Sequence, residues 1–140
     1  MKSITITTST GLTAHGIEFK GTTFVNLSPH ALNMITRDHG TLTVDPPVLA
    51  DGSQAKEADL PRLGQLKTET TEPGDPLRTF ITRFEDPVNV PDPIKGVMFV
   101  VSVFIASAMP ARGRQDFVSV NLFRDTKGVI VGADGFVSSL

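Results

Sequence analysis

Alternation of apolar and polar residues with a period of two dominates this chain and predicts a protein built mainly from β-strands. The alternating stretches are rich in β-branched and aromatic residues, and glycine, proline and aspartate, which favour turns, separate them. We expect strands over residues 4–7, 22–27, 31–36, 41–44, 60–71, 77–85, 97–101, 116–123, 129–131 and 132–140.

One apolar stretch differs from the others, because residues 97–101 are apolar on both faces and therefore belong in the centre of a sheet. Ser102 can then cap a short helix over 103–109 that Pro110 ends, and this is the only helix we expect. Consecutive strands with short turns favour antiparallel pairing. The pattern predicts a mainly β (α+β) fold: a compact antiparallel barrel or sandwich with one short helix near residues 103–109.

Composition narrows the class of protein further. The chain has 140 residues, which is the size of one domain, so we expect a single domain over 1–140. Its net charge of −2 argues against a dedicated surface for extended nucleic acid. The absence of cysteine excludes disulfides, thiolate nucleophiles and cysteine-ligated metal sites.

The amino-acid sequence also lacks recognisable targeting signals and cofactor-binding motifs. The longest apolar run is too short for a bilayer, which needs ~20 residues, and the N-terminus lacks the apolar stretch of a signal peptide. The sequence holds no P-loop and no nucleophile elbow, and its histidines show no metal-ligand spacing. We therefore expect a cytoplasmic protein without cofactor or metal, and without a membrane partner.

The segment Asn26-Leu27-Ser28-Pro29-His30 closes one predicted strand and opens the next. Its polar side chains can bond nearby backbone, and Pro29 stiffens the corner. Two interpretations of His30 stay open. The imidazole is either a ligand contact or proton-transfer group, or it belongs to a structural corner and bonds a carbonyl.

Three arginines are further candidates. Arg62 lies in an apolar stretch and is either a strand-edge residue whose head reaches solvent or an anion contact, since its planar fork suits carboxylate and phosphate. Arg112 and Arg114 lie in the loop 112–116 beside Asp116. This loop is either a phosphate or carboxylate clamp, or a solvated loop in which Asp116 pairs with one arginine.

Residues 24–32, with the sequence FVNLSPHAL, resemble the opening "VNLTPHAI/V" of a family of small proteins from bacteria and phages. Residues 60–63 are similar to an "ARV"-like strand of that family, and residues 114–116 and 124–133 resemble its "R-x-D" and "RD-x-x-G-x-I-x-G-C" elements. The resemblance covers 24–137, with 1–20 as an N-terminal extension or strand. This chain departs from the pattern at Ala133, where the family has cysteine.

The resemblance implies a phage or bacterial setting and positions for a site, but no particular reaction. It favours one shared ligand-binding site over separate structural roles. The residues of that site are Asn26, His30, Arg62, Arg112, Arg114 and Asp116.

Three functional hypotheses follow. The first is a module that binds an anionic small molecule, such as a nucleotide, and that in a phage would sequester a signal of host immunity. The second is a hydrolase or lyase with His30 as general base and Asp116 or an arginine stabilising charge. The third is a structural or oligomeric accessory protein, a virion component for example, whose strand over 3–10 adds to the sheet of another copy.

Overall fold

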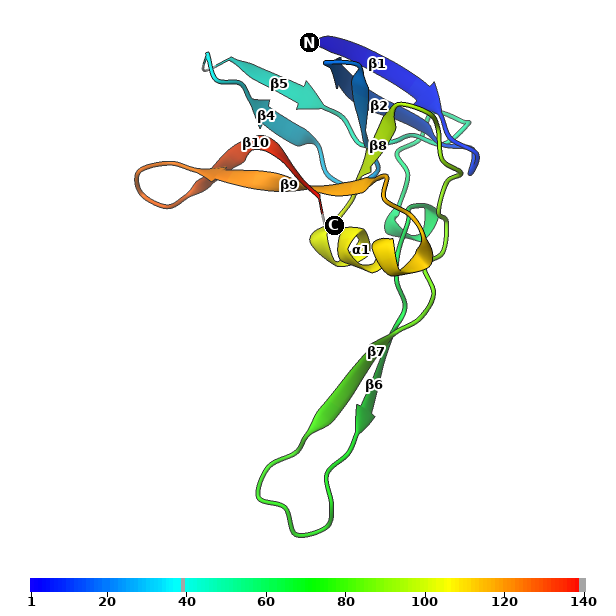
Figure 1. Cartoon of the computed structure of the whole chain (residues 1–140), viewed down its shortest axis with the longest axis vertical. Coiled ribbons are helices and arrows are strands. Elements are labelled where there is room, and N and C mark those ends of the chain that lie inside the picture. The colour runs from blue at the N-terminus through cyan, green and yellow to red at the C-terminus, as the bar shows by residue number, and fades with distance from the viewer. Residues whose placement is uncertain (39, 139–140) are drawn as a thin grey trace.

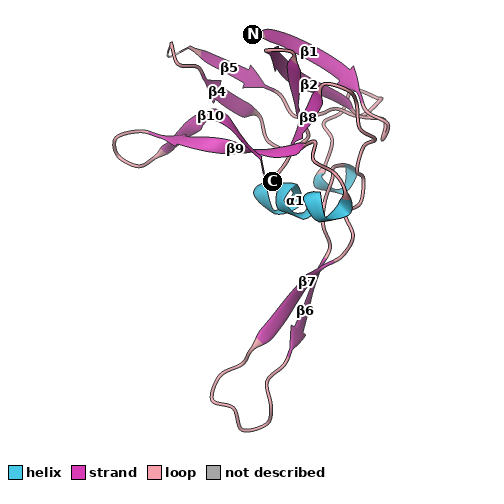
Figure 2. Cartoon of the chain, viewed as in Figure 1, coloured by secondary structure: helices cyan, strands magenta, loops and turns pink. Residues whose placement is uncertain are grey.

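The structure, a computed structural model, describes residues 1–38 and 40–138. It confirms the predicted mainly β class with one short α-helix (Figure 2). The strands are β1 (Lys2–Thr7), β2 (Thr13–Phe19), β3 (Thr22–Asn26), β4 (Leu32–Ile35), β5 (Thr41–Val44), β6 (Gln65–Glu69), β7 (Phe80–Phe84), β8 (Val97–Val100), β9 (Phe117–Arg124) and β10 (Ile130–Ser138). The helix is α1 (Val103–Ala108), and two 3-10 turns are η1 (Glu57–Asp59) and η2 (Pro110–Arg112).

Eight of the strands form one curled sheet in the order β1-β2-β3-β8-β9-β10-β4-β5, which bends into a half-barrel (Figure 1). Strands joined by short turns pair antiparallel, as expected. The pairs β3–β8, β8–β9 and β10–β4 are parallel. Parallel neighbours require long connections, so these pairs join distant segments and make the sheet mixed.

Strand β8 lies in the middle of the sheet, between β3 and β9, as its two apolar faces predicted. Val25 of β3 pairs with Phe99, and Phe99 pairs in turn with Phe117 of β9. All three side chains are buried. Exclusion of their apolar surface from water stabilises this central part of the sheet.

The core has two parts, one on each face of the sheet. The larger part includes Val25 and Phe99 and receives Ala106 from α1 and Leu60 from the segment between η1 and β6. The smaller part contains Ile17, which comes from β2, together with side chains of β4, β5 and β10. These strands are far apart in the sheet order, so the curl of the sheet brings their side chains together.

Helix α1 is one residue shorter than the range predicted for it. Ser102 occupies the N-cap position, but its hydroxyl makes no capping hydrogen bond. The helix ends at Ala108, and Pro110 starts the 3-10 turn η2, as expected from its missing N–H. Ala106 packs into the core, whereas Val103 and Phe104 face solvent.

Two segments differ from the expected strands. Strand β2 was not predicted, because Gly16 interrupts its alternation, yet β2 pairs with β1 and β3, so residues 1–20 supply two strands of the sheet. The strand predicted over 60–71 is limited to β6, and Arg62 forms only an isolated bridge to Val88. His39, in the predicted turn 37–40, and residues 139–140 lie outside the described residues.

Strands β6 and β7 form a separate two-stranded hairpin that projects from the body of the protein (Figure 1). We call residues 65–84 the β6–β7 arm. Every residue of its two strands is exposed. The arm starts and ends beside the hollow described next, where Gln65 and Phe84 form part of the wall.

Candidate functional site

A hollow of about 790 Å³ lies where the corner after β3, the segment before the arm, the end of β8 and helix α1 meet. Both His30 and Arg62 line it, so the structure brings together two of the residues proposed from the sequence. Its other polar side chains come from Ser28, Glu57, Gln65 and Ser102. We call it the His30–Arg62 hollow.

The wall of this hollow is mostly apolar and rigid. Leu27, Leu60, Val100 and Val101 line it and are buried in the core. Close packing of such side chains holds the surface in one shape. The polar groups therefore stand on a preformed apolar surface, which is the usual composition of a small-molecule site.

Asn26 fixes the position of His30 from beneath and does not line the hollow. Its side chain is fully buried, with 0% exposure. The amide nitrogen donates to the carbonyl oxygens of His30 at 2.9 Å and of Val44 and Asp45 at 3.2 Å. The amide oxygen accepts from the backbone N–H and hydroxyl of Ser28 at 2.9 and 2.7 Å. Asn26 therefore positions the corner, and its polar atoms are fully used by the protein.

The side chains of His30 and Arg62 are exposed, although the backbone of each is held in place. The backbone of Arg62 exchanges two hydrogen bonds with Val88, at 2.9 and 3.2 Å. Within residues 1–38 and 40–138, neither the imidazole of His30 nor the guanidinium of Arg62 has a hydrogen-bond or ion-pair partner. Both groups are thus free to contact a ligand.

The loop 112–116 lies elsewhere and satisfies its own charges. Arg114 makes a two-pronged ion pair with Asp116, with N–O distances of 2.9 and 2.7 Å, and its guanidinium lies over the ring of Phe117. Arg112 donates to the carbonyl of Ala108 at 3.0 Å and to Asp86 at 3.4 Å. Among the described residues that line the His30–Arg62 hollow, none comes from this loop.

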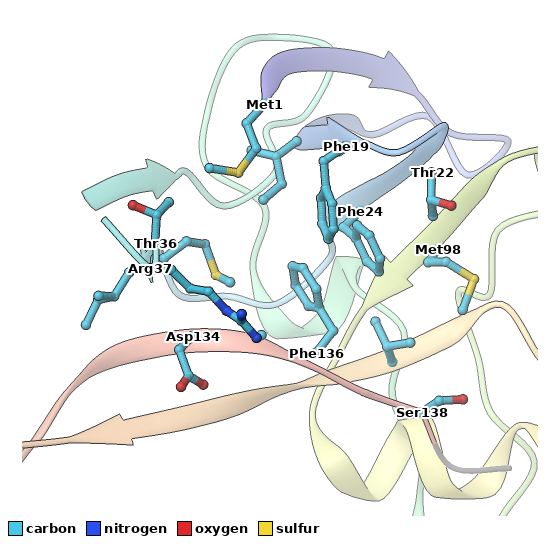
Figure 3. A pocket seen from close by; sticks show the side chains of 15 residues that line it. Met1, Phe19, Thr22, Phe24, Thr36, Arg37, Met98, Asp134, Phe136 and Ser138 are labelled. Carbon is cyan, nitrogen blue, oxygen red and sulfur yellow. The ribbon is translucent and has the colours of Figure 1, made fainter. Parts of the chain in front are cut away.

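A second hollow, of about 590 Å³, lies within the curl of the sheet and was not anticipated from the sequence (Figure 3). Phe19, Phe24 and Phe136 stack along its wall, with centroid separations of 5.3 and 4.1 Å. Arg37 reaches into it from the opposite side. The alternation of residues places Phe24 on one face of its strand. It does not show that Phe136, from a strand distant in sequence, stacks on Phe24.

No helix within the described part of the chain is long and apolar enough to cross a membrane. No protein-family model, curated protein or solved structure matches this chain. A function for this protein is therefore inferred from the geometry of the two hollows and of the arm.

Proposed function

We propose that this protein binds a small anionic molecule, in particular a nucleotide, in the His30–Arg62 hollow. One observation carries the proposal: Arg62 and His30 line the same hollow, and within residues 1–38 and 40–138 neither side chain has a hydrogen-bond partner. A guanidinium offers several donors in a fixed fork that fits phosphate oxygens. An imidazole adds a further donor at the same site.

The shape and lining of the hollow support this class of ligand. Its volume of about 790 Å³ lies in the range of roughly 300–1,000 Å³ that is usual for small-molecule sites. The apolar wall, with Leu60 and Val101, suits a base or sugar ring, while Arg62 suits a phosphate. Glu57, also at the hollow, can accept hydrogen bonds from amino or hydroxyl groups of the ligand.

The resemblance to bacterial and phage proteins gives this binding a biological setting as part of the proposal. A protein that binds without turnover would lower the free concentration of its ligand. In the cytoplasm of a phage-infected bacterium, such a protein would sequester a nucleotide signal of host immunity.

Calorimetric titration of the purified full chain with nucleoside monophosphates, nucleoside diphosphates and cyclic dinucleotides tests the proposal. We expect one of these classes to bind, and Arg62→Gln to weaken its binding about 10- to 100-fold, because hydrogen bonds to charged groups contribute about 1.5–3 kcal/mol. Arg37→Gln, which removes the same charge at the other hollow, is the matched control and should bind as the unaltered chain does. Absence of heat with all three classes would refute the proposal.

Recovery of the ligand separates binding from catalysis. The bound nucleotide is incubated with the protein, released by denaturation and analysed by mass spectrometry. An unchanged nucleotide supports sequestration. A converted nucleotide, whose conversion is lost in His30→Gln, would instead establish the hydrolase or lyase alternative with His30 as general base.

A further inference from the structure

The β6–β7 arm has a conformation that the rest of its own chain does not explain. It forms a two-stranded sheet by itself, and all ten of its strand residues are exposed. An isolated two-stranded hairpin is marginally stable in water, and stability normally requires further strands or a surface on which to pack. The arm therefore needs a partner surface.

The chain as a whole exposes more surface than a monomer of its size. A folded monomer of 15.0 kDa is expected to expose roughly 7,000 Å². This chain exposes 8995 Å², which is about 2,000 Å² more. A standard protein interface takes about 800 Å² from each partner, so the excess is large enough for a stable assembly.

The two faces of the arm differ in character. Phe80 lies on one face, where Lys67 and Arg78 place their cations 4.5 and 5.2 Å from the centre of its ring. Leu66 and Ile81 lie on the other face, since Leu66 pairs with Arg83 and Thr68 with Ile81. The two residues are 54% and 48% exposed. The Leu66–Ile81 face is the one that association would remove from water.

The body of the same chain offers exposed apolar side chains that can cover such a face. They lie on helix α1 and at the outer ends of β9 and β10. Those that do not line the His30–Arg62 hollow are Val103, Phe123, Ile130 and Val131. Because arm and acceptor occur on one chain, identical copies can cover each other reciprocally, as in most homo-oligomers.

We infer that the β6–β7 arm is an assembly arm, which packs its Leu66–Ile81 face against a second copy of this chain. The inference does not depend on the ligand proposed above, since it follows from the exposed surface and the shape of the arm. The partner copy supplies the surface that a lone hairpin lacks.

Light scattering after size-exclusion chromatography of the full chain, over a series of concentrations, tests this inference. We expect a particle with the mass of at least two chains of 15.0 kDa. A shortened variant replaces residues 67–82 with Asn-Gly, which fits because Leu66 and Arg83 are directly paired and Asn-Gly closes a two-residue hairpin. This variant should have the mass of a single chain.

A double variant, Leu66→Thr with Ile81→Thr, should also dissociate, because it makes the Leu66–Ile81 face polar. Threonine is favoured in strands, so the hairpin itself should be retained. Leu77→Thr is the control, since Leu77 lies outside the paired strands and is more exposed than either. Circular dichroism and thermal melting verify that each variant is folded. A monomeric full chain, an unchanged assembly in the folded shortened variant, or dissociation by Leu77→Thr alone would overturn the inference.

Discussion

Phe24 of β3 and Phe136 of β10 stack face to face, with ring centroids 4.1 Å apart and ring planes within 3° of parallel. The two strands are not neighbours in the sheet, so the stack bridges its curl. We predict that Phe136→Ala lowers the free energy of unfolding by about 2 kcal/mol, because it removes this contact and leaves a gap. Leu77→Ala, at a more exposed position outside the paired strands, is the control and should change stability by less than about 0.5 kcal/mol. Denaturant unfolding measures both, and equal effects would contradict the prediction.

Replacement of Asn26 tests its role in the corner that presents His30. Asn26→Ala removes the amide that bonds the carbonyls of Val44 and Asp45 and the N–H of Ser28. Each unsatisfied buried group costs about 1–3 kcal/mol, so we expect a loss of about 2–4 kcal/mol in the free energy of unfolding. Asn33→Ala, at an exposed position of β4, should cost less than about 0.5 kcal/mol. A loss for Asn26→Ala as small as that for Asn33→Ala would show that the corner does not depend on this amide.

Gly16 allows strands β2 and β3 to approach closely. A side-chain carbon at this position would overlap the carbonyl oxygen of Phe24. We therefore expect Gly16→Ala to cost about 1–3 kcal/mol in the free energy of unfolding, as overpacking usually does. Gly135→Ala, in β10, has no atom within 4 Å of the added carbon and should be neutral or slightly stabilising. Chemical denaturation of the two variants gives the comparison, and the reverse order of stability would argue against the observed β2–β3 pairing.

The ion pair across the arm gives a prediction about pH. The hydrogen bond from Arg78 to Glu69, with an N–O distance of 2.8 Å, holds the pKa of the Glu69 carboxyl below its ordinary value. Because the pKa is lower in the folded arm, the pair stabilises the arm above the unfolded pKa of Glu69, and this contribution is lost as the pH falls through the folded pKa. Titration by nuclear magnetic resonance should show the Glu69 pKa rising toward its ordinary value in Arg78→Gln. An identical titration in the two proteins would mean that the pair does not persist in solution.

Local pattern accounts for most of the strands and for α1, because alternation and capping depend on residues that are close in sequence. It also indicated the central place of β8. It missed β2, whose alternation Gly16 interrupts, and it carries no information on the parallel pairs such as β3–β8. Those pairs depend on contacts between segments that are far apart in the chain.

The sequence indicated some residues of the candidate site but not which of them lie together. His30 and Arg62 were each recognisable as unusual in their segments, and the structure places both at one hollow. Arg114 was an equally good candidate in the sequence, yet its guanidinium forms an ion pair with Asp116 within the loop. Whether an arginine has a partner depends on side-chain geometry, which residue type and spacing do not determine.

The place of β10 in the sheet has a consequence for synthesis on the ribosome. β10 follows all other described strands in the chain, yet in the strand order it alone links β9 to β4 and β5. A nascent chain whose residues 130–138 have not yet left the ribosome can therefore form the part β1-β2-β3-β8-β9 and the β4–β5 hairpin, but not the continuous sheet. Completion of the half-barrel must wait until these residues emerge, and until then the edges of β4 and β9 that pair with β10 stay open to chaperones or to misassembly with neighbouring chains.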